Sequence, residues 1–309
     1  MKRKTNILIL LIVALVAVLV FSEPAVASAD VGPKPSIDIT LCNLGDGVCF
    51  GTILSESIST GPYSAYAPDK GMNKDFGNYD SNYYYDENYH NEEVERIWQV
   101  FVDYEDADGY YFLQIWWKLG GEDNFIKWGY HPPYSFKLLL YYPETNTFVT
   151  SGIYERYAFD SYYLVDMEGV DVTQGGTQLT LNKSYDYTWE IFSLLCRIVL
   201  TIAIEIAVAL LFRIKGRRAL LTILITNVVT QIALNVALNL LCYFHGGLLL
   251  FFLYVPLEIA VTLVEAVTYL IALRKQNVPV WKSIAYAVVA NVVSAFLGLF
   301  LAIFIPGLF

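Results

Sequence analysis

The stretch WEIFSLLCRIVLTIAIEIAVALLF, residues 189–212, decides the architecture of this chain. Its length exceeds the roughly 20 apolar residues that an α-helix needs to cross a hydrocarbon core of about 30 Å. Three more segments of this kind follow, at residues 219–243, 248–273 and 283–305. The sequence therefore predicts a four-helix membrane domain over residues 189–309.

Each apolar segment carries one side chain that lipid solvates poorly: Glu205, Asn227, Glu265 and Asn291. Each of these lies seven or eight residues from the end of its segment that adjoins the loop at 213–218 or the loop at 274–282. At about 1.5 Å per residue, all four lie about 12 Å inward from those ends. Because polar groups at this depth face the interior of a bundle, we expect the four side chains to form one layer.

A second polar layer is predicted about two helical turns further along, with Arg197, Asn235 and Glu258. A charge at bilayer depth costs at least ~2.5–3.5 kcal/mol, so it needs a partner inside the bundle. We expect Arg197 to form an ion pair with Glu258. Glu205 and Glu265 are then left without a basic partner.

Two facing carboxylates in a medium of low dielectric constant repel each other, so Glu205 and Glu265 either share a proton or hold a cation. A set of carboxylate and amide oxygens suits a proton or a hard cation better than zinc. The alternative is that these groups only hydrogen-bond across the helices and hold them together. The sequence leaves both interpretations open, and it does not identify a metal.

The first 29 residues have the three parts of a signal peptide, and the alternative is an uncleaved anchor, which also places residue 30 outside the cytoplasm. Lys2, Arg3 and Lys4 are followed by an apolar run at residues 7–21 and by the small-residue pattern Ala27-Ser28-Ala29. Basic residues in the loops at 213–218 and 274–282 place these loops in the cytoplasm. Residues 30–188 and the C-terminus are then extracytoplasmic, and the location is a bacterial cell membrane.

Residues 30–188 contain 9 Lys and Arg and 25 Asp and Glu. This negative charge argues against nucleic acid or anionic lipid as a partner of this region. Residues 92–104 have the apolar spacing of a short helix. Aromatic and aliphatic runs separated by turn residues follow it and predict strands, among them residues 110–119 and 135–142. We expect a mainly-β (α+β) extracytoplasmic domain, either a sandwich or a sheet covered by the helix.

Cysteines and histidines give little sign of a metal or catalytic centre. The spacing of Cys42 and Cys49 is compatible with a disulfide in an exported domain, and equally with two free thiols. The three histidines lie far apart in loops, and no nucleotide-binding or metalloprotease motif occurs. Residues 106–109, Asp-Ala-Asp-Gly, are predicted to form a turn rather than a calcium loop, because Tyr104 and Ile115 occupy ligand positions. No catalytic residue and no cofactor is predicted.

Four segments carry a resemblance: residues 31–36, 59–62, 104–114 and 151–161. Together with the Glu and Asn positions of the membrane domain, they resemble a group of exported four-span membrane proteins of Gram-positive bacteria that have no known activity. The resemblance covers nearly the whole mature chain. It implies the same architecture and assigns no functional residues.

These observations predict a non-enzymatic protein of the bacterial cell envelope. Its outer domain is expected to bind a ligand or an envelope protein, and its bundle, surrounded by membrane lipid, anchors the domain or relays that binding. Two alternatives stay open. One is a transport subunit coupled to protons or cations through Glu205 and Glu265, and the other is an intramembrane enzyme, for which no nucleophile or metal set is visible.

Overall fold

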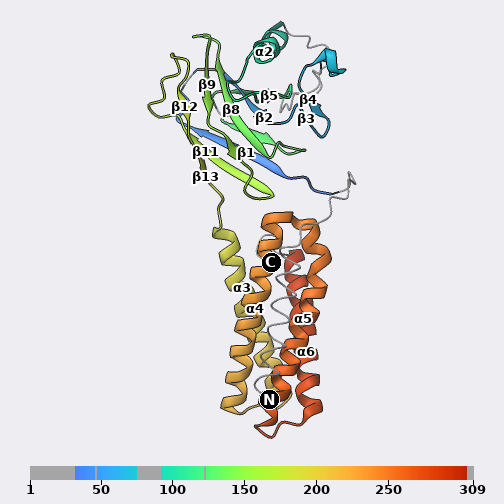
Figure 1. The fold of residues 1–309 in the computed structure, drawn as a ribbon. Helices are drawn as coiled ribbons and strands as arrows, with labels where there is room; N and C mark the ends of the chain where they lie inside the picture. The colour runs from blue at the N-terminus through green and yellow to red at the C-terminus, as the bar shows by residue number, and fades with distance from the viewer. Residues whose placement is uncertain (1–31, 46, 75–91, 122, 305–309) are drawn as a thin grey trace. The chain divides into compact units, whose positions relative to one another are not determined.

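The structure is a computed structural model that describes residues 32–45, 47–74, 92–121 and 123–304. The predicted signal peptide lies outside these residues. The chain divides into two compact units. One comprises Lys34–Tyr185, and the other contains the helices that follow Asp186. The mainly-β domain and the four long apolar helices confirm the predicted fold class (Figure 1).

Two sheets form most of the first unit. One sheet has the order β13-β11-β1-β7. Its strands are β1 (Ser36–Cys42), β7 (Phe125–Trp128), β11 (Asp160–Asp166) and β13 (Leu181–Lys183). β1 pairs with β11 in parallel and with β7 in antiparallel orientation. This sheet therefore joins segments from both ends of the domain.

The other sheet has the order β12-β9-β8-β2-β5, and β10 and β6 pair with β8 and β2. Its strands are β2 (Cys49–Ser55), β5 (Tyr111–Phe112), β6 (Trp117–Leu119), β8 (Ser135–Tyr142), β9 (Thr147–Ser151), β10 (Tyr154–Glu155) and β12 (Gln178–Leu179). The short pair β3 (Ser59–Thr60) and β4 (Tyr63–Ser64) and the 3-10 turn η1 (Pro68–Lys70) lie between β2 and α2 (Glu92–Val102).

The central strand β8 is buried at every position because both of its faces are covered. Leu138 and Leu140 pack in one apolar core with Ile39 of β1. Leu139 on the opposite face packs in a second core with Phe101 of α2. The domain thus has three layers, sheet on sheet on helix, which combines the two predicted arrangements.

The sequence predicted one strand over residues 110–119, and the structure has two. Gln114, between β5 and β6, adopts a left-handed φ of 64°, which interrupts the strand. Its buried amide accepts a hydrogen bond from Trp98 Nε1 at 3.1 Å and donates to the backbone oxygens of Ser64 and Asn73. This side chain therefore ties α2 and the segment after β4 to the sheet.

Cys42 and Cys49 are free thiols. Of the two outcomes that the sequence left open, a disulfide or two free thiols, the structure favours the free thiols. Ile39 and Leu41 of β1 are fully buried, and strand alternation turns Cys42 to the opposite, partly exposed face. Cys49 is fully buried in the core between the sheets, and this burial raises the pKa of its thiol to about 12. The two sulfur atoms therefore lie in different environments.

The turn at residues 106–109 pairs with Lys137, a buried lysine of β8. Lys137 Nζ lies 2.5 Å from Asp106 Oδ1 and 2.9 Å from Asp108 Oδ2. Burial opposes the charge on Lys137, but the hydrogen bonds to both carboxylates outweigh it and raise the pKa of the lysine. The two acids therefore neutralise a buried lysine, in keeping with a structural turn.

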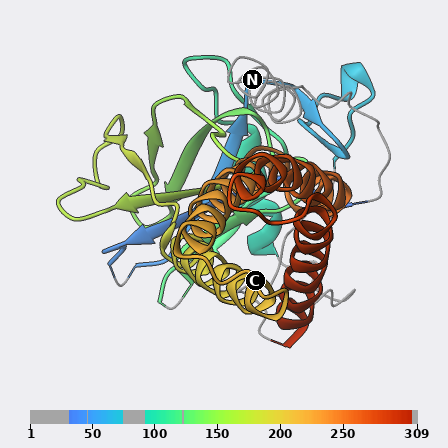
Figure 2. The ribbon, with the colours of Figure 1, turned by 90° about the horizontal axis from the view of Figure 1, so that it is seen from below.

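Four helices of the second unit, among the described residues, are long and apolar enough to cross a membrane. They are α3 (Thr188–Leu211), α4 (Arg217–His245), α5 (Gly247–Arg274) and α6 (Val280–Phe304). They form a closed ring in which α3 and α5 each pack against α4 and α6 (Figure 2). Apolar side chains such as Leu211, 81% exposed, and Phe296, 70% exposed, cover the outside of the ring, as expected for a surface in lipid.

Candidate functional site

The four side chains predicted to form one layer meet inside the bundle. Glu205, Asn227 and Glu265 are fully buried, and Asn291 is 3% exposed. One comes from each helix, and hydrogen bonds join them into pairs. Asn227 Nδ2 donates to Glu205 Oε2 at 2.6 Å, and Asn291 Nδ2 donates to Glu265 Oε2 at 2.6 Å. The sequence therefore predicted that these four side chains lie at one level of the bundle and point inward.

Three further side chains complete what we name the carboxyl layer: Thr230, Tyr269 and Tyr286. Thr230 Oγ1 donates to Glu265 Oε1 at 2.5 Å. The hydroxyl of Tyr286 donates to Glu205, 3.3 Å from Oε2 and 3.2 Å from the backbone oxygen. Asn227 Nδ2 also lies 2.9 Å from the hydroxyl of Tyr269. Every neighbouring pair of helices in the ring is thus joined by a side-chain hydrogen bond at this level.

The two tyrosines were not predicted as part of the site. Both are fully buried. Tyr269 follows Glu265 by four positions, so helical spacing already placed it on the same face. Tyr286 lies five positions before Asn291, which is not an obvious same-face spacing. Only the packing of α6 against α3 reveals its contact with Glu205.

Three oxygen atoms of the carboxyl layer are buried and have no hydrogen-bond donor. They are Glu205 Oε1, Asn227 Oδ1 and Asn291 Oδ1. A buried acceptor without a donor costs free energy, on the order of 1–3 kcal/mol. All three atoms are acceptors that a proton or a cation satisfies, because a neutral carboxyl group donates a hydrogen bond and a cation is coordinated by oxygen.

The second predicted layer is only partly formed. Arg197 Nη1 donates to Asn235 Oδ1 at 3.4 Å, and Asn235 Nδ2 donates to the backbone oxygen of Gln231 at 2.9 Å. The predicted ion pair between Arg197 and Glu258 was wrong: within the described residues, no salt bridge joins them. Arg197 lies on α3 and Glu258 on α5, which are not neighbours in the ring. Glu258 instead interacts with the hydroxyl of Tyr254 on its own helix.

Apolar clusters lie on both sides of the carboxyl layer along the bundle. Towards the α3–α4 loop the packed residues include Val208, Ile223 and Leu273. Towards the α4–α5 loop they include Leu238 and Leu257. Packed hydrocarbon therefore closes the layer towards the α3–α4 loop. On the other side, the buried polar residues Gln231 and Asn235 lie beside the apolar cluster and continue the polar interior.

No group of three or more His, Cys, Asp or Glu side chains that could hold a metal ion occurs among the described residues. The carboxyl layer contributes only Glu205 and Glu265 to such a set, together with neutral amides and hydroxyls. This composition favours a proton or a weakly charged cation over a transition metal. Comparisons with protein-family models, curated proteins and solved structures found no match for this chain.

Proposed function

We propose that this chain is a non-enzymatic protein of the bacterial cell envelope whose bundle binds a proton or a small hard cation in the carboxyl layer. Its acidic β-domain lies outside the cytoplasm and binds a ligand or an envelope protein. The loops at 213–218 and 274–282 lie in the cytoplasm, as their basic residues indicate. The bundle anchors the domain in the membrane and transmits the binding of its ligand or partner across the membrane.

The observation that carries this proposal is the set of unsatisfied oxygens in the carboxyl layer. Glu205 Oε1, Asn227 Oδ1 and Asn291 Oδ1 come from three different helices and have no donor in the structure. Hydrogen bonds that serve only to hold helices together do not require spare acceptors. A proton on Glu205 Oε1 would satisfy that atom and let it donate one hydrogen bond, and a cation bound in the layer would be coordinated by oxygens of this kind.

The charge balance supports the same proposal. No lysine or arginine contributes to the carboxyl layer, and Arg197 donates to Asn235 instead. Two ionised carboxylates in this apolar interior would be strongly destabilised by lost hydration and by mutual repulsion. At least one bound cation or one proton is needed to offset the repulsion between the two carboxylates and keep the four helices packed at this level.

The alternative is a transport subunit that carries protons or cations through the bundle. It would use the same Glu205 and Glu265. The apolar cluster towards the α3–α4 loop argues against continuous conduction through one closed bundle, since it closes that end of the carboxyl layer. The proposal is therefore binding and relay, and transport would require the ring to open.

Infrared spectroscopy of the purified chain in lipid nanodiscs tests the bundle site. We expect the absorption of a protonated carboxyl group at neutral pH, and its loss in Glu205→Gln or Glu265→Gln, or else its replacement by a carboxylate signal when Na⁺ or Li⁺ is added. Asp69→Asn, at an exposed position of η1 in the β-domain, is the control. Two ionised carboxylates at neutral pH without any bound cation would refute the proposal.

Reconstituted vesicles separate the proposal from the transport alternative. A pH-sensitive dye inside vesicles that contain the chain should respond no faster than in empty vesicles when a proton or sodium gradient is applied. A flux that disappears in Glu205→Gln would instead establish the transport function.

A further inference from the structure

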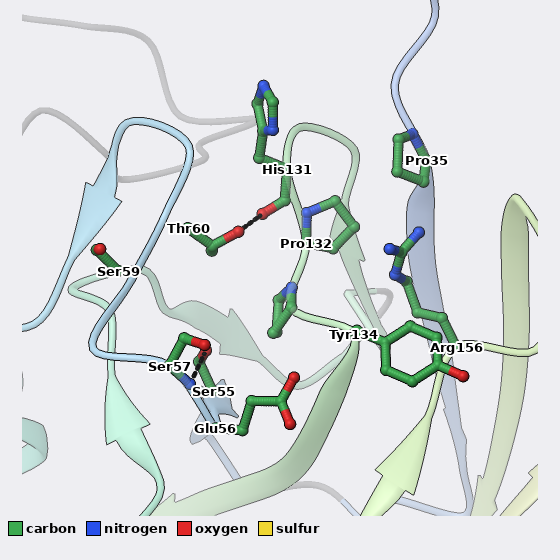
Figure 3. Close-up of a pocket in the computed structure, with 11 residues that line it drawn as sticks. Pro35, Ser55, Glu56, Ser57, Ser59, Thr60, His131, Pro132, Tyr134 and Arg156 are labelled. Atoms are coloured by element: carbon green, nitrogen blue, oxygen red, sulfur yellow. Dashed lines mark hydrogen bonds between the residues drawn. The ribbon is translucent and has the colours of Figure 1, made fainter. Parts of the chain in front are cut away.

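The β-domain contains a polar pocket of about 310 Å³ that none of the predicted site residues lines. The end of β2 and the loop after it, the strand β3, the loop at residues 131–134, the residue before β1 and the residue after β10 surround it. Its polar and charged lining includes Glu56, Ser57, Thr60, His131, Tyr134 and Arg156. Figure 3 shows Arg156 beside Tyr134 and Pro35, with Ser57, Ser59 and Thr60 further across the pocket.

Backbone and side-chain hydrogen bonds fix the walls of this pocket. The backbone N–H of Arg156 donates to the oxygen of Tyr134 at 2.9 Å, and Thr60 Oγ1 donates to the oxygen of His131 at 2.9 Å. Gly61 has a φ of +54°, and a Cβ atom there would lie 2.5 Å from His131 Cγ. The pocket is therefore built by close contacts and is preformed.

Arg156 is a cation without an acidic partner. Its Nε atom is buried and has no hydrogen-bond partner, and within the described residues no carboxylate forms a salt bridge with its guanidinium. The guanidinium lies 5.9 Å from the centre of the Tyr134 ring, which orients it without neutralising it. A guanidinium in this state is suited to a carboxylate or phosphate that accepts two of its N–H groups.

Glu56 supplies the opposite charge in the same pocket. Within the part of the chain that the structure describes, its Oε1 atom accepts one hydrogen bond, a long one of 3.4 Å from the backbone N–H of Ser135. An exposed carboxylate of this kind suits an ammonium group. The net negative charge of the domain repels a simple anion, whereas a ligand with no net charge does not meet this barrier.

We propose that this pocket binds a small zwitterion, either a free amino acid or a short peptide. Its carboxylate pairs with Arg156 and its ammonium group with Glu56, while the hydroxyls of Ser57 and Thr60 bind its remaining polar atoms. The volume lies at the lower end of the range for small-molecule sites, about 300–1,000 Å³, which limits the ligand to a few residues. This inference deepens the outer-domain part of the proposed function and does not depend on the carboxyl layer.

Calorimetric titration of the full chain in nanodiscs with L-alanine and L-alanyl-L-alanine tests the inference. Arg156→Met and Glu56→Gln should each weaken binding of the better probe by about tenfold or more, because each removes a charged hydrogen bond. Arg96→Met and Glu92→Gln, at exposed positions of α2, are the matched controls and should bind as the wild type does. N-acetyl-alanine, alanine amide and inorganic phosphate, which lack one of the two charges, should bind at least about tenfold more weakly.

Arg156→Lys guards against a folding defect, since it keeps the positive charge and loses the planar donor pair. It should give an intermediate affinity with an unchanged unfolding curve. The inference is overturned if neither probe binds, if the pocket variants bind as tightly as the Arg96 control, or if phosphate binds better than both probes. The infrared experiment tests proton or cation binding in the carboxyl layer, and calorimetry tests ligand binding in this pocket. Either proposal can therefore be refuted without the other.

Discussion

The hydroxyl of Tyr286 on α6 contacts Glu205 on α3 at two atoms, the backbone oxygen at 3.2 Å and Oε2 at 3.3 Å. One side chain thus bonds both the main chain and the carboxyl group of another helix. This contact closes the ring between the last and the first of the four helices. A change in the protonation or cation binding of Glu205 would therefore act on α6 through the hydroxyl of Tyr286.

Replacing Tyr286 by Phe should destabilise the bundle by about 1–2 kcal/mol, because Glu205 Oε2 loses one of its two donors while the ring volume is kept. Unfolding of the purified chain by a denaturing detergent, followed by the loss of helical signal, measures the change. Tyr111→Phe in the β-domain is the control. Equal stability of Tyr286→Phe and the wild type would contradict the role given to this hydroxyl.

Replacing Asn291 by Leu should cost more, about 1–3 kcal/mol, since it leaves Glu265 Oε2 buried without its 2.6 Å donor. The adjacent Val292 is 47% exposed on the outside of the ring, so Val292→Leu should change stability by less than about 0.5 kcal/mol. The same detergent titration compares the two. If the two substitutions have similar effects, Asn291 does not support the carboxyl layer.

Replacing Lys137 by Met should destabilise the β-domain by about 3–5 kcal/mol, because Asp106, whose side chain is 1% exposed, loses its buried partner. Guanidinium unfolding followed by tryptophan fluorescence reports on this domain. Lys118→Met is the control, since its 3.8 Å ion pair with Glu93 is exposed and contributes at most about 1 kcal/mol.

The same lysine predicts a pH dependence. Its pKa is raised in the folded chain by the hydrogen bonds to Asp106 and Asp108, which outweigh burial. A group whose pKa is raised on folding stabilises the chain fully below its unfolded pKa, about 10.4 for lysine, and this contribution is lost as the pH rises through the folded value. Wild-type stability should therefore fall above pH ~10, and Lys137→Met should lack this step. A parallel fall in the variant would point to other groups.

Thiol labelling should distinguish Cys42 from Cys49. Burial raises the pKa of Cys49 to about 12, so at pH ~8 its thiolate population is very small and its sulfur is shielded. Partly exposed Cys42 should react with iodoacetamide under native conditions, and Cys49 only after unfolding. Mass spectrometry of tryptic peptides measures both. A disulfide-linked peptide from the non-reduced protein would show instead that the two cysteines are paired.

The sequence was sufficient to predict that Glu205, Asn227, Glu265 and Asn291 lie at one level, because helix rise fixes their distance from the ends of their segments. It was not sufficient to predict which helices are neighbours, since an apolar face does not specify the helix against which it packs. Arg197 was paired with Glu258 because their charges are opposite, although Glu258 lies on a helix that does not adjoin its own, and the structure pairs Arg197 with Asn235 instead.

The β-domain shows the same division. The strand β8 was predicted with its bounds, Ser135–Tyr142, because prolines precede it and a turn that begins with Pro143 follows it. The break at Gln114 was missed, because its left-handed backbone depends on the distant groups that its amide bonds. The pocket around Arg156 was also missed, because its walls come from loops far apart in the sequence.

The ring of hydrogen bonds has a consequence for biosynthesis. Tyr286 and Asn291, which supply one donor each to Glu205 and Glu265 respectively, both belong to α6, the last of the four helices to leave the ribosome. Until α6 packs against α3 and α5, both acids lack one of these donors. Docking of α6 is then the step that closes the ring around the two acids of the newly made protein.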